Sequence, residues 1–169
     1  MTLRRPAAAA LVCAAAAVAP GEALAVNPKP TTIPALREWS GGSGHVRLGR
    51  DVRIVLDAAG CRRLRGTARV LADDLRGLGH RRPRVVRRCR PGAAFTARSG
   101  PSIHLRLGAQ DRELGPEGYS LTIARRRATV RANTPAGVLY GTRTLLQLLR
   151  QGPLPAGTAR DWPRYPSAA

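Results

Sequence analysis

A leucine-rich segment near the C-terminus most constrains the fold of this chain. Thr134 and Pro135 predict the start of a helix there. A threonine hydroxyl can cap the first turn, and the amide hydrogen that proline lacks would have no hydrogen-bond partner in the first turn. Apolar side chains then spread around most of the helix circumference: Val138, Leu139, Leu145, Leu146, Leu148 and Leu149. Such a helix is normally buried between two layers. We expect a sheet on one side, and on the other a cover that the chain does not carry in full.

The region before this helix alternates in the manner of short strands. Apolar and polar residues alternate over six stretches: 46–48, 52–56, 84–86, 103–107, 119–123 and 128–132. The last two predict a β-hairpin. Leucines and alanines recur at helical spacing between Leu64 and Leu78, and Gly79 ends that helix. The order predicts an α+β fold, with a mainly antiparallel β-sheet and two helices packed on one face.

The N-terminal residues have the pattern of an export signal. Arg4 and Arg5 precede an apolar stretch too short to span a bilayer, and Ala23-Leu24-Ala25 matches a cleavage site. We therefore expect residues 1–25 to be a signal peptide and the protein to be secreted, without a membrane anchor after cleavage. Residues 26–44 are rich in Pro and Gly and predict an extended lead-in, residues 45–160 predict the α+β domain, and residues 161–169 follow it.

Two cysteines, Cys61 and Cys89, remain after cleavage of the signal. An oxidising compartment would allow a disulfide between them, but spacing does not show that their Cα atoms come within bonding range. A disulfide and two free thiols both stay open.

Arginine dominates the charge of the chain. Lys and Arg total 29 against 10 acidic residues, a formal net charge of +19. Such a field attracts anionic polymers without specificity. The single Phe, two Trp and three Tyr provide few stacking platforms for nucleic-acid bases, so we expect no specific nucleic-acid partner.

Three blocks in the second half of the chain carry a family resemblance. They are residues 115–123, which begin Gly-Pro-Glu-Gly-Tyr, residues 134–149, and residues 161–165, which read Asp-Trp-Pro-Arg-Tyr. In this order and spacing they resemble the end of the N-terminal domain of bacterial β-N-acetylhexosaminidases of glycoside hydrolase family 20. The resemblance implies a glycosidase of carbohydrate metabolism that removes terminal N-acetylhexosamine. It also implies that a catalytic (β/α)8 barrel follows, reached through an Arg-Gly pair. Pro166-Ser167-Ala168-Ala169 stands in place of that pair, so we expect a truncated or split gene or a fragment of a longer product.

The residues that perform family 20 chemistry are not recognisable in this chain. The resemblance implies an Asp-Glu pair in the barrel, in which one carboxylate orients the substrate acetamide and the glutamic acid protonates the leaving oxygen. No Asp-Glu dipeptide occurs; Asp73-Asp74 is an adjacent acidic pair on the first helix, where a solvated helix face is the ordinary outcome. His45, His80 and His104 have no metal-ligand spacing. We expect no catalytic residue, cofactor or metal, and no activity for the chain alone.

The resemblance implies instead that the domain packs against a family 20 barrel and supports it. The expected barrel-packing face is on the second helix, at Val138, Leu139, Leu145, Leu146 and Leu149. Some of these side chains would face water in the chain alone, and the isolated protein would bind a hydrophobic dye. The alternative is an independent secreted accessory module that binds glycan or an anionic cell-wall polymer through an Arg-rich face.

Overall fold

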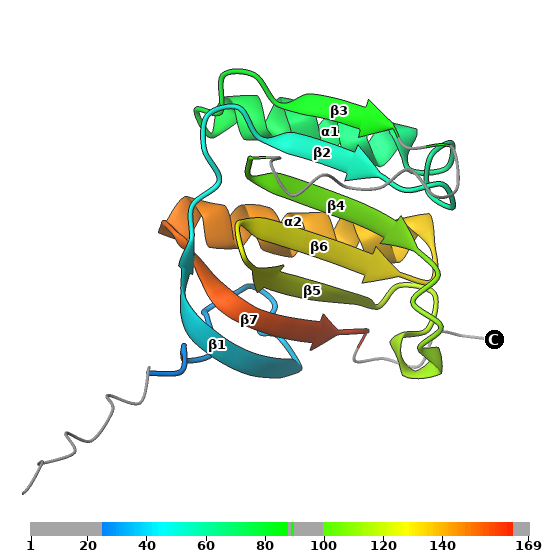
Figure 1. Cartoon of the computed structure of the whole chain (residues 1–169). Coiled ribbons are helices and arrows are strands. Elements are labelled where there is room, and N and C mark those ends of the chain that lie inside the picture. The colour runs from blue at the N-terminus through cyan, green and yellow to red at the C-terminus, as the bar shows by residue number, and fades with distance from the viewer. Residues whose placement is uncertain (1–24, 88, 90–99, 164–169) are drawn as a thin grey trace, which may run out of the picture.

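The computed structural model describes residues 25–87, 89 and 100–163 (Figure 1). The expected signal peptide, apart from Ala25, lies outside the described residues, as do residues 164–169 of the C-terminal segment. Among the described residues, no helix has the length and hydropathy needed to cross a bilayer.

One seven-stranded sheet organises the described part of the chain, in the order β1-β7-β5-β6-β4-β2-β3. Its strands are β1 (Glu38–Val46), β2 (Arg53–Leu56), β3 (Arg84–Arg87), β4 (Ser102–Leu107), β5 (Tyr119–Ala124), β6 (Arg127–Ala132) and β7 (Leu154–Asp161), with a short 3-10 turn η1 (Arg112–Leu114). The expected hairpin is confirmed as β5 and β6.

The α+β class is confirmed, but the sheet is mixed rather than mainly antiparallel. Strands β1, β7, β5 and β6 pair antiparallel along one half, whereas β6, β4, β2 and β3 pair parallel along the other. Helix α1 (Arg65–Gly77) connects β2 to β3 as a crossover, which returns the chain to the same end of the sheet. A parallel pair needs such a connection, whereas an antiparallel pair can be joined by a tight turn.

Helices α1 and α2 (Pro135–Gln151) lie side by side behind the sheet in Figure 1, so both cover the same face. Alternate strand residues point toward them and are fully buried, among them Ile103, Leu105, Leu121 and Val130. The Thr134 cap is confirmed, since its hydroxyl accepts a hydrogen bond from the Gly137 amide at 3.3 Å. The sheet therefore supplies one of the two layers that α2 needs.

The lead-in and its flanking chain contribute more to the sheet than the sequence predicts. Residues 38–44 of the extended lead-in are part of strand β1, which the sequence did not predict. The glycines permit close approach: a Cβ on Gly41 would lie 2.1 Å from the carbonyl oxygen of Asn27. Asn27 in turn donates from Nδ2 to the carbonyl oxygens of Gly44 and Ala156, at 2.7 and 3.0 Å. Strand β7 was also not expected, because its small side chains show no clear alternation.

Much of the second cover of α2 comes from the lead-in itself. The side chain of Gln147 on α2 exchanges two hydrogen bonds with the backbone of Ile33, both at 2.8 Å, and Gln151 donates to the Thr31 carbonyl at 2.7 Å. The leucines beneath are buried, with 0, 4 and 1% exposure for Leu145, Leu146 and Leu148. The expectation that α2 leucines face water is therefore wrong for these three, because the extended lead-in and α1 flank the helix, whereas Leu139 and Leu149 are partly exposed.

Candidate functional site: a groove beside residues 161–163

A groove of about 480 Å³ runs between the lead-in, α2 and the end of β7. Its rim carries exposed apolar side chains, since Ile33 is 83% exposed and Tyr140 on α2 is 47% exposed. Trp162 and Pro163 close one side, directly after β7. The groove therefore offers apolar surface at the point where the chain leaves the domain.

Tyr119 lines the groove from its buried position at the start of β5. Its hydroxyl lies 2.5 Å from Thr144 Oγ1 and donates to Asp161 Oδ2 at 3.3 Å. Burial raises the pKa of the Tyr119 phenol well above its usual range, and the Asp161 carboxylate adds to this effect. The phenol stays protonated and links the sheet, α2 and the end of β7.

Arg37 fastens the residues that follow β7. Its amide donates to Asp161 Oδ1 at 3.3 Å, its Nε donates to the Trp162 carbonyl at 2.9 Å, and its Nη2 donates to the Pro163 carbonyl at 2.8 Å. The guanidinium carbon also lies 4.8 Å from the centre of the Trp162 ring, within cation–π range. The backbone of residues 161–163 is therefore held against the start of β1.

Arg160 approaches the same indole from within a cluster of carboxylates. It pairs with Glu38 and Asp111 at 2.6 Å and with Glu113 at 3.0 Å, and its guanidinium lies 5.6 Å from the Trp162 ring centre. The hydrogen bond from Arg160 holds the pKa of Asp111 below its ordinary value of 3.8. The stabilisation from this pair is complete above pH 3.8 and is lost as the pH falls through the lowered pKa. These three carboxylates hold Arg160 in place, which is a structural role.

The acidic and imidazole side chains considered above as catalytic or metal-binding candidates lie apart from one another. Asp73 pairs with Arg76 on the same helix, whereas Asp74 pairs with Arg143 of α2 at 2.6 Å. The imidazole of His104 lies 3.2 Å from the Ser102 hydroxyl. In the described part of the chain, no group of three or more His, Cys, Asp or Glu side chains could hold a metal ion.

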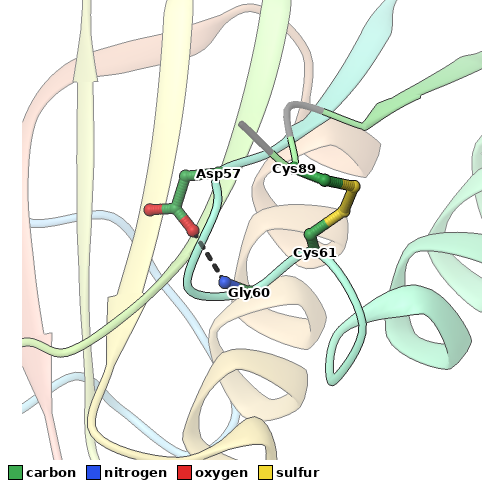
Figure 2. The surroundings of a disulfide bond; sticks show 4 residues. All are labelled: Asp57, Gly60, Cys61 and Cys89. Atoms are coloured by element: carbon green, nitrogen blue, oxygen red, sulfur yellow. Dashed lines mark hydrogen bonds between the residues drawn. A yellow bond between two sulfur atoms is a disulfide. The ribbon is translucent and has the colours of Figure 1, made fainter. Parts of the chain in front are cut away.

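Cys61 and Cys89 form a disulfide in the structure, with their Cα atoms 5.4 Å apart (Figure 2). The bond joins the turn before α1 to the residue shortly after β3. Asp57 supports this turn, since its carboxylate accepts a hydrogen bond from the Gly60 amide at 2.9 Å. Of the two alternatives that the sequence left open, the structure therefore has the disulfide.

Of the five residues expected to face a barrel, three are already packed inside the domain. Val138, Leu145 and Leu146 are buried, so they offer no surface to another domain and belong to the core instead. Leu139 and Leu149 are partly exposed, and contact of these two with a barrel stays a prediction. The periodicity of α2 could not separate the two groups, because it does not report what covers the helix.

Sequence reasoning did not identify Arg37, Tyr119 and Thr144 as members of this site. Arg37 is one of many arginines, and Tyr119 alternates with Leu121 and Ile123 like any inward strand residue. The signal that did point here was the resemblance of residues 161–165.

Tyr119→Phe is expected to lower the free energy of unfolding by about 1–3 kcal/mol near neutral pH, because Thr144 and Asp161 each lose a buried partner. Since folding raises the Tyr119 pKa, its contribution is complete below pH 10.0 and is lost as the pH rises above that value. Urea unfolding from pH 7 to 11 should therefore give a flatter profile for Tyr119→Phe. A profile parallel to that of the unmodified protein would contradict this role.

Comparison with known proteins assigns this chain to one family. Residues 29–162 match the family described as glycosyl hydrolase family 20, domain 2. Lacto-N-biosidase from Bifidobacterium bifidum is 36% identical over 140 residues, which make up 81% of this chain and 12% of that protein.

Solved structures agree. The β-N-acetylhexosaminidase of Streptomyces coelicolor is 29% identical, with a TM-score of 0.58 over 78% of this chain and 26% of that one. A mutant β-hexosaminidase of Streptomyces plicatus is also 29% identical, with a TM-score of 0.61 over 84% of this chain and 28% of that one. The chain thus spans about a quarter of these enzymes, and it belongs to glycosyl hydrolase family 20 as a domain 2 of that family.

Proposed function

We propose that this chain is the non-catalytic domain of an exported β-N-acetylhexosaminidase-type glycoside hydrolase and that it supports a family 20 catalytic barrel. The groove beside residues 161–163 is the surface that meets the barrel. The observation that carries the proposal is the anchoring of Asp161, Trp162 and Pro163 by Arg37 and Tyr119. A following domain would start from a fixed position and direction.

The apolar rim of the groove supports the same surface. Ile33, Tyr140 and Trp162 come from three different segments, so a domain seated there would contact the lead-in, α2 and the end of β7 together. Burying one such side chain is worth about 1.5–3 kcal/mol relative to leaving it in water.

The proposal of export rests on the pattern of residues 1–25. The absence of an Asp-Glu pair supports a non-catalytic role.

The test is a chimera in which residues 26–163 replace the matching domain of the Streptomyces coelicolor enzyme. Tyr140→Asp should lower the melting temperature of the chimera by several degrees and leave that of this chain alone nearly unchanged, because Tyr140 is exposed until the barrel covers it. Ala124→Asp is the matched control, since Ala124 is exposed on the opposite face of the sheet. The chimera should release p-nitrophenol from its N-acetylglucosaminide, and the chain alone should not exceed a no-protein blank.

Two outcomes would contradict the proposal. One is turnover by the chain alone that persists through repurification. The other is a melting temperature that responds to Tyr140→Asp equally in the chimera and in the isolated chain, because the groove would then not be the contact surface.

A further inference from the structure

An arginine-rich surface lies at the edge of the domain formed by α1 and β3, which Figure 1 shows together at the outer end of the sheet. Asp74 marks the flank of α1 that faces α2, since it pairs with Arg143 there. Arg65 precedes Asp74 by nine residues, or about two and a half helical turns, so it lies on the opposite flank. Arg69 follows Arg65 by four residues and shares that flank.

The disulfide brings more arginines to the same edge. Cys61 is followed directly by Arg62 and Arg63, and its bond to Cys89 holds this turn next to the end of β3. Strand β3, at the edge of the sheet, begins with Arg84 and ends with Arg87. We call this surface the arginine edge, and its members are all exposed: Arg62, Arg63, Arg65, Arg69, Arg84 and Arg87.

Within the described residues, these guanidinium groups have no carboxylate partner. None of the six forms an ion pair with another described residue. In contrast, Arg106, Arg143 and Arg160 elsewhere in the domain pair with carboxylates at 2.6–3.1 Å. The nearby acids are engaged too, Asp73 with Arg76 and Asp74 with Arg143. Like charges held together in this way repel one another, and an anion that spans them would relieve the repulsion.

Charge on an edge strand also has a purely structural use, because it discourages pairing with the edge of another sheet. That explanation covers Arg84 and Arg87. It does not cover Arg62, Arg63, Arg65 and Arg69, which lie before or on α1 and border no free strand. Protection of the sheet edge therefore does not account for these four arginines.

We propose that the arginine edge binds a linear phosphodiester polymer that carries no bases, such as a polyol phosphate. Guanidinium groups bind phosphate oxygens through two parallel hydrogen bonds. A single exposed ion pair contributes little, but a polymer that contacts several arginines at once releases several counterions and gains affinity from each. Arg65 and Arg69 are about 6 Å apart along the helix axis. On β3, Arg87 points to the face of the sheet that α1 covers, whereas Arg84, three residues earlier, points to the opposite face. An extended chain of charges therefore fits along Arg62, Arg65, Arg69 and Arg87.

The low aromatic content of the chain favours a polymer without bases. Proteins that bind single-stranded nucleic acid stack the bases on aromatic rings, and the sequence has only one Phe, two Trp and three Tyr to provide them. This binding is separate from barrel support, since the edge and the groove share no residue.

The test measures binding of the full chain to end-labelled poly(glycerol phosphate) by fluorescence anisotropy at several salt concentrations. The variant R62Q/R65Q/R69Q/R87Q should bind about tenfold or more weakly, with a shallower dependence of affinity on salt, because fewer counterions are released. The control R112Q/R125Q/R131Q/R150Q removes the same charge from exposed positions elsewhere and should retain most of the affinity. Circular dichroism and melting temperatures should match among the three proteins.

Equal losses in the two variants would overturn the proposal, because the overall charge rather than this edge would then be responsible. Tighter binding to an oligothymidylate of matched length and charge would also overturn it, since the bases would then contribute. The proposal is also refuted if poly(glycerol phosphate) shows no measurable binding to the unmodified chain or to the control variant. None of these measurements depends on hydrolysis or on a barrel.

Discussion

Gly137→Ala is expected to destabilise the domain by about 3 kcal/mol, although alanine forms helices better than glycine does. A Cβ at this position on α2 would lie 2.3 Å from the carbonyl oxygen of Gly118 and 2.8 Å from the Cβ of Ala132. The first contact is with backbone, which cannot rotate away, so the helix must move off the sheet. The steric cost therefore exceeds the gain of about 1 kcal/mol in helix propensity.

Gly66→Ala on α1 is the matched control, because a Cβ there meets nothing within 4 Å. This change should stabilise the domain by about 0.5–1 kcal/mol. Urea unfolding of the two variants should show midpoints that shift in opposite directions at similar slopes. A gain of stability in Gly137→Ala would show that α2 does not approach β5 and β6 as closely as described.

Removal of the disulfide is expected to have an effect of similar size. The double variant C61S/C89S opens a loop with a sequence separation of 28 residues, which should lower the free energy of unfolding by roughly 3–4 kcal/mol through the entropy of the unfolded chain. Guanidinium unfolding of residues 26–169, folded under oxidising conditions and measured with and without reductant, gives the difference. The variant should not respond to reductant, which controls for other effects of the reagent.

Thiol titration of the oxidised, unfolded protein checks the bond directly. No free thiol is expected in a chain that starts at Val26, since Cys61 and Cys89 are its two cysteines. Two free thiols per chain, with no change in stability on reduction, would refute the pairing.

The covering of α2 changes what stability can reveal about function. Leu145, Leu146 and Leu148 are buried without a second domain, so the argument for a dye-binding, marginal isolated chain no longer holds. A stable monomer is therefore compatible with barrel support. The surface left for a partner is the groove and its rim, and the response to Tyr140→Asp is the informative measurement.

Several elements could be predicted from the sequence because their signals are local. The alternation of Ile103, Leu105 and Leu107 predicts β4, and the apolar spacing from Leu64 to Leu78 predicts α1. The Thr134 cap marks the start of α2, since a cap depends on a few neighbouring residues. The resemblance of residues 115–165 identified the family, because those blocks occur in a fixed order and spacing.

The features that only the tertiary structure determined depend on contacts between residues far apart in the chain. Strands β1 and β7 consist largely of small residues whose pattern is weak, and they become strands because each supplies the other's hydrogen-bond partners across more than a hundred residues. The second cover of α2 has the same origin, since Gln147 binds the backbone of Ile33.

The site beside residues 161–163 also depends on the tertiary structure. Arg37, Tyr119 and Asp161 have no shared periodicity, and they meet because the sheet brings β1, β5 and β7 side by side. Periodicity reports which side of an element is apolar, but it does not report which distant segment will cover that side. The sequence therefore determined the two helices, the strands with clear alternation and the family, whereas the folded chain determined β1 and β7, which α2 leucines are buried and which surface remains for a partner.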